Sequence, residues 1–230
     1  MNEPKRAASF SASGQKKRGG KRKLSGLQIA VIALGAVVFL CAASFGGYLI
    51  YEEVQYQRAL ENYPVAYTDL ISEYAEQYDL DPYLVQAIMR CESSNDPGAV
   101  SDAGAIGLMQ IMPDTGTWIA HKLGLDDVYT EDMLYDPQTS VEFGCWYLRF
   151  LSGRFNANRK QMIAAYNAGH GSVEKWLEDP LYSQNGELVT IPFEQTARYY
   201  DKVMTAYENY TTLYPDLFRS AEGAQSIVEA

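Results

Sequence analysis

The chain combines one continuous apolar stretch with a longer segment in which apolar residues recur every three or four positions. Residues 24–51 contain no Asp, Glu, Lys or Arg, and most of them are apolar. About 20 such residues are enough for a helix that crosses a bilayer. The pattern therefore predicts a single N-terminal transmembrane helix over 24–51, with the lipid bilayer as its partner.

Beyond this stretch, the apolar spacing is that of amphipathic helices whose exposed faces carry Glu, Asp and Lys. Residues 52–63 continue as a polar helical stalk, which Pro64 interrupts. Helices are expected over 65–78, 82–93, 114–123, 137–151, 159–167, 172–177 and 194–209. The segment 187–191 can form a short extended piece. The fold class is therefore mainly α, with one domain over 64–210 and a loosely held tail over 211–230.

The charge around the apolar stretch predicts its orientation. Residues 1–23 hold eight Lys and Arg against one acid, Glu3. Because positively charged segments stay in the cytoplasm, we expect 1–23 to form a basic cytoplasmic tail. Everything after Tyr51 is then exported to the wall side of the cell membrane. A cleavable signal peptide is the alternative, with small residues at 42–44, but its apolar core spans only about 7–15 residues, which favours an uncleaved single-pass anchor.

The exported segment is strongly acidic. The chain has 19 basic residues (Lys and Arg) and 29 acidic residues (Asp and Glu). Eight of the basic residues and one of the acidic residues precede residue 24. The rest of the chain therefore holds 11 basic and 28 acidic residues and has a net charge of −17. Because the negatively charged backbone of a nucleic acid binds positively charged surfaces, nucleic acid is excluded as a partner. The 179 residues after Tyr51 have room for one globular domain with its own core.

Three cysteines do not make a disulfide framework. Cys41 falls inside the apolar stretch, where the bulky Phe39 and Leu40 before it argue against a lipid-modified cysteine. Cys91 and Cys145 remain as a candidate disulfide pair, because both belong to the segment expected outside the cytoplasm, where oxidising conditions allow disulfides. Two buried free thiols are the alternative.

Glu92 is the candidate catalytic residue. The helix predicted over 82–93 begins with an Asp cap and a first-turn Pro, and Val85, Ile88 and Glu92 fall on one face of it. The face that buries the two apolar residues carries Glu92 into the core or to the wall of a cleft. Burial raises the pKa of a carboxyl group, which suits a proton donor near neutrality. The alternative is a solvated Glu at the helix end, or one paired with Arg90.

Three ordered motifs strengthen the catalytic interpretation. They are Glu-Ser at 92–93, Gly-Leu-Met-Gln-Ile-Met-Pro at 107–113 and Ala-Tyr-Asn-Ala-Gly at 165–169. Together they resemble the catalytic domain of the soluble lytic transglycosylase family over roughly residues 64–209. The resemblance implies a lysozyme-like fold of the goose type and an enzyme that cleaves the glycan strands of peptidoglycan.

The resemblance also implies a mechanism with one acid. Most glycosidases use two carboxylates. In the lytic transglycosylases one Glu protonates the leaving oxygen of the β-1,4 bond between MurNAc and GlcNAc, and the substrate's own N-acetyl group stabilises the cation. The same Glu then removes the proton from the C6 hydroxyl, which closes a 1,6-anhydro ring without water. Glu92 takes this role by its motif, and no cofactor or metal is expected.

Five further positions carry a role over from the family. Ser101 matches a serine near the acid and the acetamido group, and Gln110 and Met112 match residues that line the sugar sites. Tyr166 and Asn167 match a Tyr-Asn pair facing the acid, whose phenol can hydrogen-bond toward the carboxyl or the N-acetyl group. In a purely structural interpretation Met112 fills the core and Tyr166 is an ordinary half-buried aromatic.

The last matching segment departs from the family pattern. Gln195 stands where the family usually has Glu, and Tyr199 matches the family tyrosine three residues after Thr196. An amide can still bind a sugar hydroxyl but carries no charge, so Gln195 and Tyr199 are candidate substrate-binding residues. Asn95 also replaces a usual aromatic, which affects loop packing and not the chemistry.

Three other functions compete with this interpretation. A hydrolytic muramidase of the same fold would activate water with a second carboxylate such as Asp96 or Asp102. A catalytically idle wall-binding scaffold has little need to keep the Glu. A metal-dependent hydrolase is disfavoured because the two histidines, His121 and His170, lie on separate predicted elements.

Overall fold

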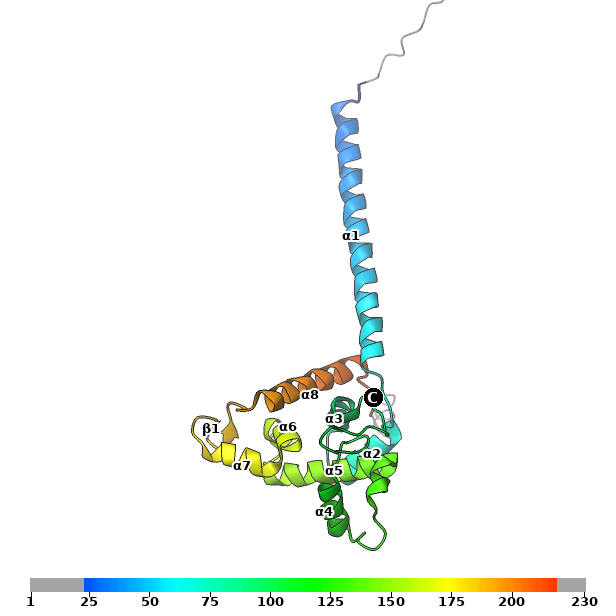
Figure 1. Ribbon diagram of the computed structural model, residues 1–230. Helices are drawn as coiled ribbons and strands as arrows, with labels where there is room; N and C mark the ends of the chain where they lie inside the picture. The colour runs from blue at the N-terminus through cyan, green and yellow to red at the C-terminus, as the bar shows by residue number, and fades with distance from the viewer. Residues whose placement is uncertain (1–22, 219–230) are drawn as a thin grey trace, which may run out of the picture. The chain divides into compact units, whose positions relative to one another are not determined.

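The computed structural model describes residues 23–218, so most of the predicted basic tail and the end of the predicted C-terminal tail lie outside the described residues. The chain divides into two compact units, Met1–Val54 and Gln55–Ala230. Figure 1 shows a long helix and a set of shorter helices. The mainly α fold class is confirmed.

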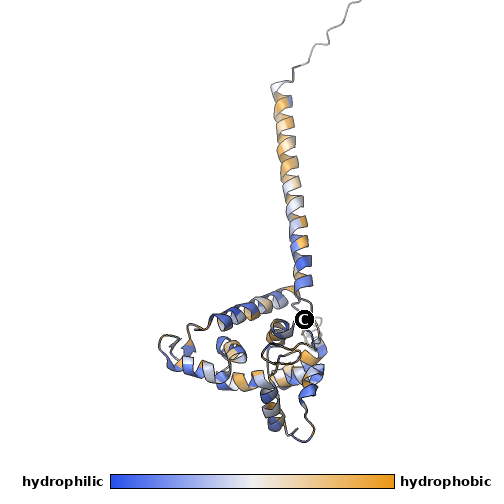
Figure 2. Cartoon of the chain, in the orientation of Figure 1, coloured by the Kyte–Doolittle hydropathy of each residue, from blue (hydrophilic) through white to orange (hydrophobic). Residues whose placement is uncertain are grey.

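The first unit contains most of α1, Gly26–Asn62. Ser25 and Gln28 open this helix with reciprocal bonds in which each side-chain oxygen accepts the other residue's backbone N–H, at 2.9 and 3.3 Å. The apolar residues gather in the first part of the helix and polar residues follow (Figure 2). By length and composition α1 can cross a membrane. The polar stalk is helical as predicted and ends two residues before Pro64.

The second unit contains the remaining elements. These are α2 (Thr68–Gln77), α3 (Pro82–Ser93), α4 (Pro113–Leu123), the 3-10 helix η1 (Glu131–Tyr135), α5 (Pro137–Arg154), α6 (Arg159–Ala168), α7 (His170–Glu178), β1 (Ser183–Gln184), β2 (Glu187–Leu188) and α8 (Glu194–Leu213). Side chains cap three of the helices: Asp81, Asp136 and Asn158 each accept a backbone N–H from the first turn that follows. The caps fix where α3, α5 and α6 begin.

The buried core of this unit surrounds α3 and α6. Val85, Ile88 and Met89 on α3, and Ile163 on α6, are fully buried. Helix α3 packs mainly against α8 and also against α2, whereas α6 packs against α5, α7 and α8. Helix α8 therefore covers both central helices, and its fully buried Val203 belongs to the same core.

The last helix also holds the start of the domain. Tyr210 Oη donates to the Pro64 carbonyl and Tyr214 Oη donates to the Tyr63 carbonyl, each at 3.0 Å. The ring of Tyr63 meets that of Tyr210 edge-on, with centroids 5.8 Å apart. We call these contacts the α8 clasp. The tail expected from residue 211 is thus helical through Leu213 and packed at Tyr214, because its aromatic side chains find partners on the domain.

Two elements, η1 and β1, were not predicted from the sequence. The 3-10 helix η1 has no helical apolar repeat of its own, since Leu134 is its one buried residue. Of the extended piece expected over 187–191, only Glu187–Leu188 is a strand, β2, which pairs with β1 in a small antiparallel hairpin. Asn185 and Gly186 form its turn with positive φ values of 55° and 80°, and such an Asn-Gly pair is a strong hairpin signal.

The candidate disulfide is wrong in this structure. Cys91 and Cys145 are both free thiols. Cys91 lines a pocket between α3 and α8, next to Lys202. Cys145 on α5 is completely buried, and burial together with the charge of Glu142 raises its pKa far above the usual value. The two thiols face different neighbours, so each is packed separately.

Candidate active site

Glu92 lies in the last turn of α3, and its position agrees with the predicted amphipathic face. Ile88 and Val85, one and two turns earlier on that face, are 0% exposed, and Glu92 itself is partly buried. Ser94 then ends the helix in a left-handed conformation with φ 57°. The carboxyl group therefore sits where a buried face reaches the end of its helix.

Burial controls the ionisation of Glu92. Loss of solvation raises its pKa from the usual value of 4.5 to about 7, while a hydrogen bond from Tyr199 acts in the opposite direction. Tyr199 Oη donates to Glu92 Oε1 at 2.5 Å. Near neutral pH the carboxyl can thus release a proton and take one up, which is the requirement for an acid that later serves as a base.

Two buried phenols flank this carboxyl, but their bonds differ from the prediction. Tyr166 on α6 was expected to hydrogen-bond toward Glu92 or the N-acetyl group, and its Oη donates instead to the Met109 carbonyl at 2.8 Å. Tyr199 on α8 makes the bond to the acid. Burial first and the charge of Glu92 second raise the pKa of both phenols well above 10, so both stay protonated.

Arg90 is not the partner of Glu92. Its guanidinium donates to the Asn62 carbonyl and to Ser94 Oγ. The salt-bridged alternative for Glu92 is therefore wrong. The pKa of the Glu92 carboxyl is therefore determined by its partial burial and by the hydrogen bond from Tyr199.

The glycine-rich loop before α4 is braced from several sides. Two isolated bridges, Val100 with Ile106 and Ile106 with Ile111, fold it on itself. The Gly107 N–H donates to the Ala99 carbonyl at 2.9 Å. Gly107 has φ +76°, and a Cβ at this residue would stand 2.0 Å from the carbonyl oxygen of Leu134. The loop therefore requires glycine at this position.

Gln110 and Ser101 are used within this loop. Gln110 has φ 48°, and its Nε2 donates to the carbonyls of Ala99 and Gly107, both at 3.0 Å. Its Oε1 remains available as an acceptor. Ser101 Oγ accepts the N–H of Ala105 at 3.0 Å in a tight turn. The structure thus shows local structural bonds for both residues, beside any role toward a sugar.

Four of the predicted residues line one pocket. Gln110, Met112, Tyr166 and Asn167 border a volume of about 250 Å³ at the C-terminal end of α6. Gln195 lines a second pocket of about 330 Å³. Asn167 belongs to both, and its Oδ1 accepts a hydrogen bond from Thr196 Oγ1 at 3.0 Å, which ties α6 to α8.

The structure therefore brings most of the predicted residues to two connected places. Glu92 and Tyr199 are joined directly by a hydrogen bond. Tyr166 links this pair to the first pocket, because its buried phenol feels the charge of Glu92 and Tyr166 also lines that pocket. Sequence reasoning missed Trp176 and Phe193, whose rings lie 5.5 Å apart at the second pocket. Their spacing in the sequence gave no signal, because they belong to different elements.

Asp96 and Asp102, the candidate second carboxylates of a hydrolase, do not act on Glu92. Asp96 and Asp102 are exposed, and Asp96 Oδ1 accepts the Gly98 N–H at 2.9 Å. Neither contributes to the pKa shift of Glu92. Within residues 23–218 the structure has no cluster of three His, Cys, Asp or Glu side chains able to hold a metal ion, and His121 instead contacts Asp126 at 2.9 Å.

Comparison with known proteins agrees with the motifs. The family model of the transglycosylase SLT domain matches residues 69–186. The soluble lytic murein transglycosylases of Salmonella typhimurium and Escherichia coli are each 36% identical to this chain over 152 residues, which is 65% of this chain and 23% of theirs. The membrane-bound lytic murein transglycosylase C of Actinobacillus pleuropneumoniae is 33% identical over 165 residues, 63% of this chain and 45% of its own. The chain thus spans about a quarter of the length of the soluble relatives.

Solved structures show the same similarity. The 70-kDa soluble lytic transglycosylase of Escherichia coli superimposes with a TM-score of 0.62 and 32% identity over 72% of this chain and 27% of its own. Its complex with bulgecin A gives a TM-score of 0.63. An inactive Glu-to-Gln mutant of the lytic transglycosylase Slt from Pseudomonas aeruginosa gives 0.59 over 65% of this chain and 24% of its own. The chain belongs to the transglycosylase SLT domain family.

Proposed function

We propose that this protein is a membrane-anchored peptidoglycan lytic transglycosylase, which cleaves the MurNAc-GlcNAc β-1,4 bond and leaves 1,6-anhydro-MurNAc ends. One observation carries this function: Glu92 is a partly buried carboxyl whose pKa is raised to about 7 by loss of solvation, against the opposing effect of the hydrogen bond from Tyr199. A single acid of this kind suits a reaction in which one group first gives a proton and then takes one.

The proposed reaction begins with protonated Glu92. It donates its proton to the glycosidic oxygen while the neighbouring N-acetyl group stabilises the sugar cation. The Glu92 carboxylate then accepts the proton of the C6 hydroxyl as that oxygen attacks the anomeric carbon. Because nucleophile and electrophile belong to one sugar, the ring closure gains from proximity. The bond from Tyr199 stabilises the carboxylate between the two steps.

The pockets beside the acid support the assignment of the substrate-binding residues. Gln110, Met112, Tyr166 and Asn167 would contact the glycan in the first pocket, and Gln195 in the second. Ser101 would reach the acetamido group with its hydroxyl hydrogen, since its oxygen already accepts the Ala105 N–H.

Relatives support the activity and the location. Similar proteins are named lytic murein transglycosylases, two of them soluble and one membrane-bound, and a structural neighbour is inactive as a Glu-to-Gln mutant. The apolar first part of α1 and the eight basic residues before it favour a single span with the N-terminus in the cytoplasm and the domain on the wall side.

The experiment is product analysis on purified peptidoglycan by mass spectrometry, with the full-length chain in detergent. We expect anhydro-ended fragments from the parent and none from Glu92→Gln, which keeps the size of the side chain. Reducing ends would identify a hydrolase and refute the lyase. Release of no fragment by the parent would favour the scaffold, and turnover by Glu92→Gln near the parent's rate would move the acid elsewhere.

A further inference from the structure

Glu92 occupies a place where a helix tends to fray. It lies in the last turn of α3, which ends one residue later at Ser93. The last carbonyls of a helix have no partners within it, and helix ends open easily. A proton donor that must meet one oxygen of a bound sugar needs a fixed position. The contacts that hold this turn therefore determine how well the acid is aligned.

The two residues after the helix have an unfavourable backbone conformation. Ser94 and Asn95 have φ values of 57° and 67°, both in the left-handed region. Neither residue is glycine, and other residues keep this conformation only where the surrounding structure enforces it. Asn is among the few that tolerate it. Contacts of the neighbouring side chains are therefore needed to hold the chain in this shape.

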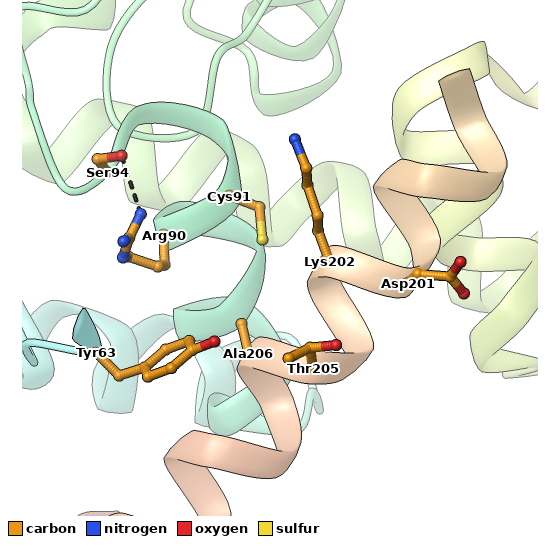
Figure 3. Close-up of a pocket in the computed structure, with 8 residues that line it drawn as sticks. All are labelled: Tyr63, Arg90, Cys91, Ser94, Asp201, Lys202, Thr205 and Ala206. Carbon is orange, nitrogen blue, oxygen red and sulfur yellow. Dashed lines mark hydrogen bonds between the residues drawn. The ribbon is translucent and has the colours of Figure 1, made fainter. Parts of the chain in front are cut away.

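Arg90 makes the first set of these contacts. Its Nη1 donates to Ser94 Oγ at 3.0 Å, and its Nε and Nη2 donate to the Asn62 carbonyl at 3.3 and 3.1 Å. Asn62 is the last residue of α1, so its carbonyl is one that a helix leaves unpaired. Figure 3 shows Arg90 between Ser94, to which it is bonded, and the segment that carries Tyr63. Arg90 thus joins the C-terminal ends of α1 and α3, where a positive charge is also favourable.

Asn95 makes the second set. Its Nδ2 donates to the Pro64 carbonyl at 3.3 Å, and its Oδ1 lies 3.5 Å from Nε2 of the fully buried Gln86. Tyr210 of the α8 clasp donates to the same Pro64 carbonyl at 3.0 Å. The amide serves as donor and acceptor at once, which the aromatic ring usual at this position in the family cannot do. The departure of Asn95 from the family pattern therefore has a structural reason.

These contacts attach the turn of the acid to residues 62–64, which we call the junction segment. Arg90 and Asn95 stand two residues before and three residues after Glu92, and they bind the first and last carbonyls of the junction segment. The α8 clasp binds the same segment to α8, and α8 also carries Tyr199, which donates to Glu92. The junction segment is thus bound both by the helix of the acid and by the helix of its phenol.

The guanidinium acts on the acid through position and not through charge. Loss of solvation and the bond from Tyr199 determine the pKa of Glu92. The titratable groups that interact with this carboxyl are the phenols of Tyr199 on α8 and Tyr166 on α6, and the thiol of the adjacent Cys91. Burial raises the pKa of each of the three, so all are neutral near pH 7. What Arg90 contributes is the fixed turn on which Glu92 stands.

We propose that Arg90 and Asn95 are positioning residues for the acid: by binding the junction segment, they hold the last turn of α3 so that Glu92 faces Tyr199 and the glycan. The chain that leads into the domain thereby becomes part of the support of the active site. This inference rests on the proposed function. It goes beyond that function by giving a role in the reaction to two side chains that touch neither the sugar nor the reacting atoms.

The first test is the steady-state kinetics of Arg90→Gln and Asn95→Gly, as full-length proteins in detergent, on soluble glycan strands. Glycine at residue 95 keeps the left-handed backbone and removes only the amide. We expect kcat to fall about tenfold in each variant, because a misplaced catalytic group raises the barrier of the reaction. KM should change less than about twofold, since the pockets at the end of α6 keep their contacts with the sugar.

Each variant has a matched control that repeats the same substitution elsewhere. Arg149→Gln removes an exposed arginine of α5, which pairs with Asp79. Asn156→Gly replaces an exposed Asn that also has a positive φ, 51°, and lies after α5. Both controls should keep the kcat of the parent.

The pH profile separates positioning from a general loss of folded protein. Loss of solvation is the larger of the two effects on the pKa of Glu92, so a loosely held and better solvated carboxyl has a lower pKa. The alkaline limb of kcat/KM should therefore move to lower pH in Arg90→Gln and Asn95→Gly, whereas unfolding alone would leave it in place. An unchanged kcat, an equal fall in the controls, or a limb that does not move would overturn the inference. A parent that releases no anhydro-ended fragments would refute the proposed function instead.

A second measurement does not depend on cleavage. The pKa of Glu92 is read from its carboxyl carbon by NMR titration of the ¹³C-labelled full-length protein in detergent, and the signal is identified by its absence from Glu92→Gln. We expect a lower pKa in Arg90→Gln and Asn95→Gly than in the parent, and the parent's value in Arg149→Gln and Asn156→Gly. Equal pKa values in all five proteins would overturn the positioning role, whether or not the parent cleaves glycan.

Discussion

Glu92 is a residue at which stability and chemistry oppose each other. Its pKa is about 7 in the folded protein and near 4.5 in an unfolded chain, so between these pH values the folded state keeps a proton that the unfolded state has lost. Stability linked to this group is therefore complete below pH about 4.5 and decreases as the pH rises through 7. At 1.36 kcal/mol for each pKa unit, the loss is at most about 3 kcal/mol.

Replacement of the acid by its amide should reveal this cost. Glu92→Gln is expected to unfold at nearly the same temperature as the parent at pH 4.5 and at a higher temperature at pH 8. Thermal unfolding of both proteins across this range is the measurement. A difference that stays constant with pH would show that the carboxyl is solvated in the native protein.

The Tyr199 phenol has an effect of its own on the pH profile. Its hydrogen bond favours the ionised carboxyl, so Tyr199→Phe should raise the pKa of Glu92 and move the alkaline limb of kcat/KM above pH 7. Tyr166→Phe is the contrasting variant, because Tyr166 bonds the Met109 carbonyl. It should lower kcat/KM without moving that limb. A shift in Tyr166→Phe and none in Tyr199→Phe would reverse the two roles.

The burial of Glu92 could be predicted from the sequence, but its partner could not. Periodicity along one helix places Glu92 beside Val85 and Ile88, and both are buried. The choice between Tyr166 and Tyr199 depends on how α6 and α8 approach α3, and Tyr199 lies 107 residues from Glu92 in the chain. No local pattern contains that information.

At the level of elements, the capped helices were predicted best. Helix α3 begins and ends where its Asp cap and apolar repeat predicted, at Pro82 and Ser93. The hairpin at Asn185 and Gly186 had a recognisable turn signal, but its strands of two residues were too short for an alternating pattern. The 3-10 helix η1 has one buried residue and therefore no period to read.

The glycine-rich loop allows a paired test of backbone constraint. Gly107→Ala should destabilise the protein by about 3 kcal/mol or more, because its Cβ would overlap the Leu134 carbonyl. Gly104→Ala is the control: Gly104 has φ +87° but open space around it, so only the left-handed conformation costs energy, about 1–2 kcal/mol. Chemical denaturation measures both, and equal losses would show that the close approach at Gly107 relaxes freely.

At the scale of the whole molecule, the charge before α1 predicts a topology. In intact protoplasts, added protease should degrade the exported domain while an N-terminal epitope tag stays protected until the cells are lysed. The eight basic residues that precede the apolar stretch are the reason. Loss of the tag from intact protoplasts would place the N-terminus outside.

The α8 clasp has a mechanical consequence. Tyr210 and Tyr214 hold the carbonyls of Pro64 and Tyr63, and Arg90 holds that of Asn62. A pull on the chain before Tyr63 would therefore be resisted at α8 and α3, and it would bypass the glycine-rich loop and the pockets at the end of α6. In the proposed function, tension on the anchored chain would thus be borne by α3 and α8 without distorting the two pockets proposed to hold the glycan.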